Sequence, residues 1–273
     1  VTGVQTCALP ICPVAHIIRS VYRLTPKSTL TQDMIFFADR AEVRFDTQVD
    51  WHDDHRFLKT AFDTSIFTDY ARFEVQFGNV KRPTARNTTV EQAKFEVLNH
   101  KYTDLSESRY GAALLNDCKY GISVEGGQMR LSLHKGGCRP DYKGDHGVHD
   151  CVYAFLPHQG AFDVNHVVKP AYQLNYPPVL AGKAFTALPL ALPEAENILV
   201  ETIKPCEDEA RAFIVRLYEA EGAFTNTPVR FFAGAKSAAI CNMLEEPQEG
   251  LEDLAKVSLC FHPFEIKTLR VTY

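Results

Sequence analysis

The sequence has no long basic run, no long apolar run and no closely spaced pairs of cysteines. Its formal net charge is −5, which argues against a nucleic-acid-binding protein, because such proteins usually carry a basic stripe. No uninterrupted apolar stretch is long enough to cross a bilayer. The 45% apolar and 23% charged residues are typical of a globular chain rather than a disordered or fibrous one. We expect a soluble protein that engages neither nucleic acid nor a membrane.

The eight cysteines lack the short paired spacings of a zinc knuckle or ribbon. In a chain of 273 residues they do not suggest a disulfide scaffold either. We expect reduced thiols, mostly buried as small hydrophobes, in a reducing compartment, the cytoplasm. They are Cys7, Cys12, Cys118, Cys138, Cys151, Cys206, Cys241 and Cys260.

The N-terminal segment lacks the positive region and the sustained apolar core of a signal peptide. The string from Val1 to Ile11 resembles the in-frame translation of a common sequencing-library adapter joined to an incomplete gene. We therefore interpret residues 1–12 as a non-native segment and expect the true sequence to start near Pro13, inside a longer reading frame. Such a truncated chain is not expected to carry a complete active site.

Alternation of apolar and polar residues dominates the sequence. It is complete from Glu42 to Trp51, which predicts a half-buried antiparallel strand with one solvated face. No stretch repeats strand, long amphipathic helix and strand, so a parallel α/β barrel is absent and a sandwich is favoured. Short helical turns over 89–93 or 106–110 remain open. Further alternating runs are Phe73–Phe77, Met129–Leu133, Val257–Phe261 and Leu269–Val271.

The segment from Ala171 to Pro193 is rich in proline, alanine and leucine and breaks the alternation. Several short strand-like runs follow it and predict a second, smaller sandwich. We place a boundary near residue 195, with a large β-domain over 13–195 and a small one over 196–273. The runs after the break are Ile198–Ile203, Phe213–Tyr218, Val229–Phe232, Val257–Phe261 and Ile266–Val271.

Two histidine-rich stretches invite a metal-site interpretation. His52-Asp53-Asp54-His55 follows a predicted strand, and a polar hairpin tip rarely supplies the rigid geometry that ligands need. The stretch around His146 and His149, with His134 and His158 nearby, is glycine-rich. We favour a solvated turn for the first stretch and a structural loop for the second.

Candidate hydrolytic groups cannot be paired from spacing alone. Glycoside hydrolysis needs two carboxylates facing one another, and the sequence offers candidates by residue type only. A Ser-His-Asp arrangement is equally unconstrained, and no Gly-x-Ser-x-Gly elbow is present. The candidate acids are Asp50, Asp53, Asp54, Asp104, Glu107 and Asp117.

Two loops are rich in polar groups. The loop at 82–89 reads as a hairpin connection that satisfies its own backbone, or as a sugar-facing surface in which Arg86 and Asn87 supply planar donors. The stretch "ALLNDCKYG" (113–121) begins like a buried strand and ends with an amide, an acid, a thiol, an amine and a phenol. Its target is not evident from composition.

Seven stretches together resemble the C-terminal β-domains of family 38 glycoside hydrolases, the zinc-dependent α-mannosidases, and most of all the bacterial and vacuolar branch. The resemblance covers nearly everything from Pro13 to the C-terminus, with the motifs in the family's order. The stretches are "VDWHDDHRFLKTAF" (49–62), "EVQFGNVKRPTARNTT" (74–89), "AKFEVLNHKYTDLSE" (93–107), "YGAALLNDCKYG" (110–121), "YAFLPH" (153–158), "VRLYEAEG" (215–222) and "PFEIKTLRV" (263–271).

The resemblance implies an all-β fold: a large antiparallel super-sandwich of the galactose mutarotase-like type, followed by a small terminal β-sandwich. In the family these domains pack against an N-terminal α/β barrel and a helical bundle. The barrel part holds the zinc ion, the aspartate nucleophile and the acid/base carboxylate for retaining hydrolysis of terminal α-D-mannosides. No catalytic residue or zinc ligand is therefore assigned within this chain.

The resemblance also gives the loop at 113–121 a role. In related mannosidases such a loop reaches from the β-domain toward the barrel's pocket. By that likeness Lys119 presents a cation to the site, Asp117 holds or orients it, and Asn116 and Tyr120 complete the loop. The chain departs from the branch at three positions. It has Ala85 where the branch usually has a histidine, and it has Val148 and Asp150 where the branch usually has basic residues on either side of the histidine at 149.

The sequence thus predicts the C-terminal β-part of an α-mannosidase, inactive alone, which braces the missing barrel and bundle and walls one side of a pocket for α-mannoside glycans. Zinc belongs to the parent enzyme and none is expected to bind here. Two alternatives stay open at this point: a non-catalytic carbohydrate-binding β-sandwich, and a mutarotase-like enzyme with its own acid/base pair.

Overall fold

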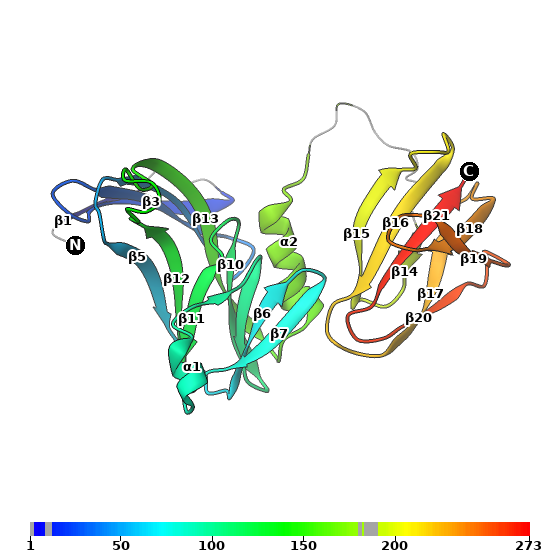
Figure 1. Ribbon diagram of the computed structural model, residues 1–273, viewed down its shortest axis with the longest axis horizontal. Helices are drawn as coiled ribbons and strands as arrows, with labels where there is room; N and C mark the ends of the chain where they lie inside the picture. The colour runs from blue at the N-terminus through cyan, green and yellow to red at the C-terminus, as the bar shows by residue number, and fades with distance from the viewer. Residues whose placement is uncertain (1–2, 9–12, 180–181, 183–190) are drawn as a thin grey trace. The chain divides into compact units, whose positions relative to one another are not determined.

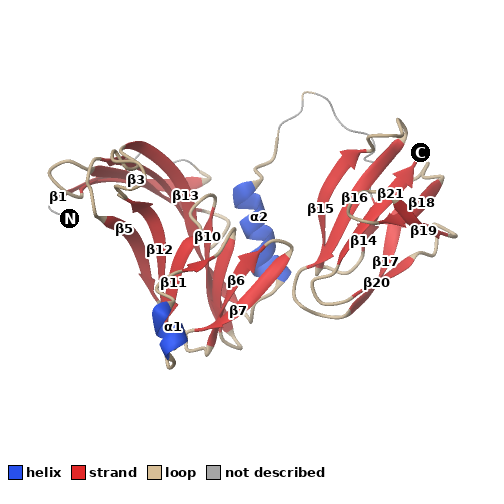
Figure 2. Cartoon of the chain, viewed as in Figure 1, coloured by secondary structure: helices blue, strands red, loops and turns tan. Residues whose placement is uncertain are grey.

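The computed structural model describes residues 3–8, 13–179, 182 and 191–273, and antiparallel strands account for most of them (Figures 1 and 2). The chain divides into two compact units. The first comprises residues 1–75, 80–162 and 166–177, and the second comprises 76–79, 163–165 and 178–273. The boundary expected near residue 195 stays a prediction, because residues 183–190 lie outside the described part of the chain.

The first unit contains two antiparallel sheets. One has nine strands in the spatial order β1 (Gly3–Ala8), β2 (Ala15–Arg23), β3 (Thr29–Phe37), β4 (Val43–Trp51), β13 (Gly147–Gln159), β10 (Tyr110–Asn116), β9 (Tyr102–Ser106), β6 (Tyr70–Val75) and β7 (Gly78–Pro83). The other has four strands in the order β5 (Phe57–Asp63), β12 (Gln128–Lys135), β11 (Gly121–Glu125) and β8 (Val97–Leu98). Strand β1 lies in the segment interpreted as non-native and pairs with β2 in continuous register.

Strand β4 shows how the alternation builds the core. Thr47, Val49 and Trp51 are buried and Gln48 is exposed, as the period-two pattern predicts. Side chains from both sheets, among them Leu114 and Leu131, join the same apolar core. The prediction of a large antiparallel sandwich is confirmed.

Two departures from simple alternation occur at the ends of strands. Phe77 was expected to continue a strand, but β6 ends at Val75 and Phe77 adopts a positive φ of 54° in the following turn. Glu42 was expected on the solvated face, yet it is 6% exposed and forms ion pairs with Arg40 and Arg44. A polar residue in an alternating sequence can therefore be buried when an ion-pair partner is available.

Helices are few and short. Helix α1 (Thr89–Ala93) begins with a capping box, in which Thr88 accepts from the Glu91 backbone N–H and the Glu91 carboxylate accepts from the Thr88 N–H. It confirms the helical turn proposed for 89–93, whereas 106–110 contains the end of β9 and the start of β10. A short π-helix (Val164–Val168) precedes helix α2 (Lys169–Asn175). None of the helices in the described ranges has the length and apolarity to traverse a membrane.

The second unit is a smaller pair of antiparallel sheets. One has the order β14 (Ala191–Pro193), β17 (Thr225–Phe231), β20 (Ser258–Phe261), and the other β15 (Ile198–Pro205), β16 (Ala212–Glu219), β21 (Ile266–Thr272), β18 (Ser237–Cys241), β19 (Pro247–Leu251). Their apolar faces enclose a core that includes Leu217, Phe261 and Leu269. The predicted small sandwich is confirmed.

A buried carboxylate, that of Glu219, connects two turns of the second unit by hydrogen bonds. Glu219 is fully buried and accepts hydrogen bonds from the backbone N–H groups of residues 221–223 at 2.7–3.0 Å. It also accepts from the Phe264 N–H at 3.0 Å and from Asn197 Nδ2 at 2.9 Å. One side chain thereby satisfies the donors of two turns that would otherwise lack partners.

The expectation that most cysteines are buried is wrong for the described residues. Cys151 and Cys241 are buried, Cys138 and Cys206 are intermediate, and the others are exposed, namely Cys7, Cys118 and Cys260. All seven are free thiols, and Cys12 lies outside the described residues. The exposed ones occupy strand faces or loops where no apolar partner covers them.

Candidate functional site

Four of the six predicted site residues lie at 116–120, where β10 leads into the loop before β11, and the Asn116 side chain fixes this loop by hydrogen bonds. Asn116 is fully buried, and its side-chain amide donates to Asn99 Oδ1 at 3.1 Å and to the His100 carbonyl at 2.5 Å. Its Oδ1 accepts from the Lys119 backbone N–H at 2.8 Å. Every polar atom of this amide group is therefore engaged in fixing the loop.

Both ends of the loop have further anchors. The Asn99 backbone N–H and side-chain amide both donate to the Tyr120 carbonyl, at 2.9 and 3.1 Å. The His100 and Tyr120 rings meet edge to face with centroids 4.9 Å apart. On the other side, the Asp117 N–H donates to the Val152 carbonyl of β13 at 3.1 Å. The backbone of the loop is thus fixed at residues 116, 117, 119 and 120.

The Lys101–Glu74 ion pair and helix α2 pack next to the residues that anchor the loop. Lys101 donates through both its backbone N–H and Nζ to the buried carboxylate of Glu74, each at 2.8 Å. Its ammonium also lies 4.6 Å from the centroid of the Tyr172 ring of α2. Asn175, at the end of α2, donates to the Asn116 carbonyl at 3.0 Å. The loop therefore rests on ordered structure.

Asp117 and Lys119 sit at the tip of the loop. One carboxylate oxygen of Asp117 is buried without a hydrogen-bond partner, and no ion pair joins it to Lys119 among the described residues. Lys119 is partly buried, and Tyr120 is 47% exposed. A buried acceptor without a donor is unfavourable, so the Asp117 oxygen marks a place where a further donor would be accommodated.

Cys118 lies between Asp117 and Lys119 in the sequence, and its thiol is expected to be unreactive. Desolvation of its sulfur, assisted by the neighbouring Asp117 carboxylate, raises the pKa of the thiol to about 12. Lys119 opposes this shift only partly. The thiol is therefore protonated at neutral pH, and it is poorly suited to act as a nucleophile or a metal ligand.

Aromatic and imidazole groups lie beside the loop. The Trp51 and His134 rings are 5.0 Å apart and the His134 and His149 rings 4.4 Å apart. Burial lowers the pKa of His134, and the nearby His149 and Lys119 lower it further. Both Trp51 Nε1 and His134 Nε2 are buried without a hydrogen-bond partner. His149 Nε2 lies 2.7 Å from the Asp145 carbonyl.

The histidines considered as metal ligands have other neighbours. His52 Nε2 lies 2.7 Å from Asp50 Oδ1, and His146 Nε2 lies 2.9 Å from Asp54 Oδ1. The Asp53 carboxylate accepts from the Thr25 and Ser28 hydroxyls, which lowers its pKa, Ser28 contributing most. Within residues 3–8, 13–179, 182 and 191–273, no three His, Cys, Asp or Glu side chains gather in a group that could hold a metal ion.

Arg86 and Asn87 lie in a second loop, between β7 and α1. Arg86 Nη1 is 3.9 Å from Glu125 Oε2, at the far end of β11 from Gly121. A five-residue strand spans roughly 13 Å, so the structure does not bring this loop together with the tip at Lys119. The Asn87 N–H donates to the Glu91 carboxylate at 2.8 Å, which is part of the start of α1.

A buried polar cluster on β9 and β13 was not identified from the sequence as a unit. The Asp104 carboxylate lies 2.9 Å from His158 Nε2 and accepts from the Ser106 hydroxyl at 2.6 Å. The Asp104 and His158 side chains are 1% and 2% exposed. Ser106 Oγ also lies 3.5 Å from His158 Nε2, so the serine and the acid approach the same ring nitrogen, whereas in a catalytic triad they contact opposite nitrogens of the histidine. Only the pairing of β10 with both strands brings the cluster together.

Two family models match the chain. The first is described as "Glycosyl hydrolases family 38 C-terminal domain" and matches residues 13–143. The second, "Glycosyl hydrolases family 38 C-terminal beta sandwich domain", matches residues 197–269. The two matched segments follow the order of the two sandwiches along the chain.

Curated relatives are similar over almost the whole chain. Alpha-mannosidase 2C1 of Homo sapiens is 37% identical over 90% of this chain and 25% of its own length. Alpha-mannosidase G of Dictyostelium discoideum is 38% identical over 89% of this chain and 23% of its own. Alpha-mannosidase of Saccharomyces cerevisiae is 31% identical over 96% and 27%. The chain spans about a quarter of the length of these relatives.

Two solved structures share the fold. A family 38 glycosyl hydrolase from Enterococcus faecalis superposes with a TM-score of 0.77, covering 98% of this chain and 36% of that one at 15% identity. An alpha-mannosidase from Enterococcus faecalis V583 gives 0.79, with 98% and 35% coverage at 15% identity. The order of motifs, the two sandwiches and these matches agree: the chain belongs to glycosyl hydrolase family 38 and corresponds to its C-terminal β-domains.

Proposed function

We propose that this chain supplies the C-terminal β-domains of a retaining α-mannosidase that hydrolyses terminal α-D-mannosides. The observation that carries the proposal is the similarity, over about nine-tenths of the chain, to proteins named alpha-mannosidases in three organisms. Their extra length leaves room for a catalytic barrel and a helical bundle, which are the proposed partners of these domains.

Retaining hydrolysis needs a nucleophilic carboxylate and an acid/base carboxyl about 5 Å apart on either side of the scissile bond. The acids of the candidate loop do not offer such a pair. Asp117 is the one carboxylate of that loop, and the buried Asp104 is committed to Ser106 and His158. The proposal therefore assigns bond cleavage to the barrel and makes this chain inactive on its own.

Zinc is likewise proposed to belong to the barrel. The described residues provide no fitting set of ligands, and the thiol nearest the loop tip stays protonated because its pKa is about 12. When bound, zinc in such an enzyme contacts sugar hydroxyls and acts as a Lewis acid. No step in this chain's own contribution depends on it.

The proposed contribution of this chain is one wall of the sugar pocket. Its backbone anchors hold the loop at 116–121 in one conformation, so that Lys119 and Tyr120 can be presented without a large ordering cost. The unpaired Asp117 oxygen is suited to accept a hydroxyl or an ammonium donor. The support is the geometry of the loop together with the family membership.

The proposal is tested by assaying the purified chain with 4-nitrophenyl α-D-mannoside, with and without added zinc. We expect no hydrolysis above background. Zinc-dependent turnover by the chain itself would overturn the division of labour. Saturable binding of mannobiose in the absence of turnover, lost on substitution of exposed aromatic residues, would instead favour a stand-alone carbohydrate-binding module.

A further inference from the structure

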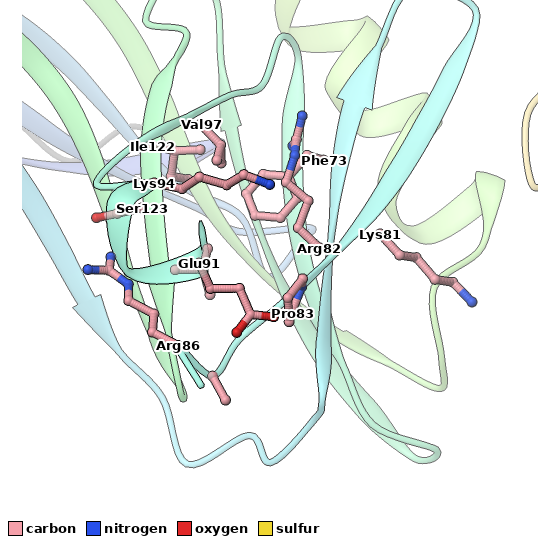
Figure 3. A pocket seen from close by; sticks show the side chains of 12 residues that line it. Phe73, Lys81, Arg82, Pro83, Arg86, Glu91, Lys94, Val97, Ile122 and Ser123 are labelled. Carbon is pink, nitrogen blue, oxygen red and sulfur yellow. The ribbon is translucent and has the colours of Figure 1, made fainter. Parts of the chain in front are cut away.

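A pocket opens where β7, helix α1 and β11 of the first unit meet (Figure 3). Its volume is about 200 Å³. None of its lining residues belongs to the loop at 116–121. They are Phe73, Lys81, Arg82, Pro83, Ala85, Arg86, Glu91, Lys94, Val97, Ile122, Ser123 and Val124.

The inner part of the pocket is apolar. Phe73 and Ile122 are 2% and 0% exposed, Val124 is 8% exposed, and Val97 packs against the same core. An apolar cavity of about 150 Å³ is large enough to hold benzene. The pocket can therefore take an aryl ring or a short branched hydrocarbon, and little more.

Arg82 forms one charged side of the pocket. Its guanidinium lies 4.6 Å from the centroid of the Phe73 ring, and Nη1 donates to the Leu98 carbonyl at 3.0 Å. Burial lowers the pKa of Arg82, and no nearby charge opposes the shift. Within the described part of the chain no carboxylate pairs with it. A partly desolvated guanidinium with unused N–H donors favours an anion that it can bind through two hydrogen bonds.

Lys94 provides a second cation. In Figure 3 its side chain extends from α1 toward Phe73 and Arg82. Lys94 forms no ion pair with another side chain of the described ranges. Lys94 does interact electrostatically with Glu91, but neither Lys94 nor Arg82 forms a close ion pair with an acid of the described residues, and the two cations together favour a carboxylate between them.

Glu91 is the one acid that lines the pocket, and it is occupied elsewhere. Its carboxylate accepts from the Thr88 and Asn87 N–H groups at 2.9 and 2.8 Å, as part of the capping box. Figure 3 shows it directed toward Pro83 rather than toward Arg82. Hydrogen bonds from these backbone groups, led by Thr88, lower the pKa of Glu91, so it remains a carboxylate and is not available as a donor to a ligand.

We propose that this pocket binds a small organic carboxylate with an apolar body. The carboxylate lies between Arg82 and Lys94, and the hydrocarbon part lies along Phe73 toward Ile122 and Val124. This site is independent of the proposed sugar-facing loop, because it shares no residue with it. The two proposals can therefore fail separately.

The test is a calorimetric or NMR titration of the whole chain with benzoate and with benzamide, its neutral counterpart of the same shape. We expect benzoate to bind with a Kd of about 1 mM, a value in keeping with its few non-hydrogen atoms. Because the charge-assisted hydrogen bonds are lost, benzamide should bind at least about tenfold more weakly. Chemical-shift changes should centre on Arg82 and Ile122.

Two variants and one matched control complete the test. Lys94→Gln should weaken benzoate binding about fivefold, and Arg82→Gln about tenfold or more. Lys135→Gln removes an exposed lysine at the end of β12 that does not line the pocket, and should leave binding unchanged. Lys94 is exposed, so its variant gives an answer even if Arg82→Gln does not fold. Equal affinity for benzoate and benzamide, no binding of either, or equal effects of the Lys135 and Lys94 variants would overturn the proposal.

Discussion

Asn116 and Asn99 form a buried side-chain pair, in which the amide of Asn116 donates to Oδ1 of Asn99 at 3.1 Å. Asn116 is the last residue of β10, and Asn99 lies in the turn after β8. Each fixes a different part of the loop: Asn116 binds the Lys119 N–H, and Asn99 binds the Tyr120 carbonyl. The pair thereby sets the conformation of the loop that the proposal places at the sugar.

Replacing Asn116 by alanine should destabilise the chain by about 2 kcal/mol, because it leaves buried partners without hydrogen bonds. Urea unfolding followed by circular dichroism measures the change. Asn87→Ala is the matched control: Asn87 is exposed, and it donates to Glu91 through its backbone N–H, so the variant should unfold within about 0.5 kcal/mol of the parent. Similar losses for both asparagines would contradict the anchoring role.

Glu219→Ala should destabilise the second unit by about 3 kcal/mol or more, since it removes the acceptor of four backbone N–H groups and of Asn197. Thermal unfolding monitored by calorimetry tests this. Glu221→Ala serves as a comparison in the same turn, because Glu221 accepts from the Val164 backbone N–H and does not bridge the two turns as Glu219 does. We expect the smaller loss for Glu221; the reverse order would show that the carboxylate of Glu219 is not the main support of the two turns.

Asp104→Asn should destabilise the first unit by about 3 kcal/mol, because the buried His158 loses a charged partner. The readout is again the free energy of unfolding. Asp39→Asn changes an exposed loop carboxylate in the same unit and should have almost no effect. Unchanged stability of the Asp104 variant would mean that the pair contributes nothing net to the fold.

Cys118 should react slowly with thiol reagents despite its position at the surface. A pKa of about 12 instead of the ordinary 9.0 lowers its thiolate fraction at pH 8 by about a thousandfold. Because the unfolded thiol ionises first, the shift makes the folded chain lose stability as the pH rises from 9 toward 12. Mass spectrometry after iodoacetamide treatment should show Cys260, which is exposed, modified well before Cys118.

Removing the acid beside Cys118 provides the internal check. Asp117→Asn deletes one of the causes that raise the pKa of the thiol, so alkylation of Cys118 should become faster at pH 8. Cys260 should keep its rate in both proteins. A Cys118 that already reacts as fast as Cys260 in the parent would rule out the shifted pKa.

Much of the fold follows from local patterns in the sequence. The alternation from Glu42 to Trp51 predicts β4 because a strand's side chains alternate between core and solvent, and the motifs of the family predict two sandwiches. The exceptions arise from local features that the alternation does not encode. Glu42 is buried because Arg40 and Arg44 are beside it, and Phe77 leaves its strand because the chain turns there with a positive φ.

The site is less predictable because its geometry depends on contacts distant in sequence. The residues Asn116 to Tyr120 could be identified as a loop, but the supports at Asn99 and Asn175 come from other elements. The cluster of Asp104, Ser106 and His158 needs the pairing of three strands before it exists. The cavity beside Arg82 depends likewise on how α1 closes over β7 and β11.

The central claim is that Lys119 faces the sugar in a complete mannosidase. It is tested most directly by replacing the matching C-terminal quarter of the Saccharomyces cerevisiae alpha-mannosidase with this chain and measuring kcat/KM on 4-nitrophenyl α-D-mannoside. We predict an active chimera whose kcat/KM falls about tenfold or more on Lys119→Gln and is unchanged by Lys135→Gln, which alters an exposed lysine at the end of β12. A folded, active chimera that is indifferent to Lys119→Gln would contradict the claim.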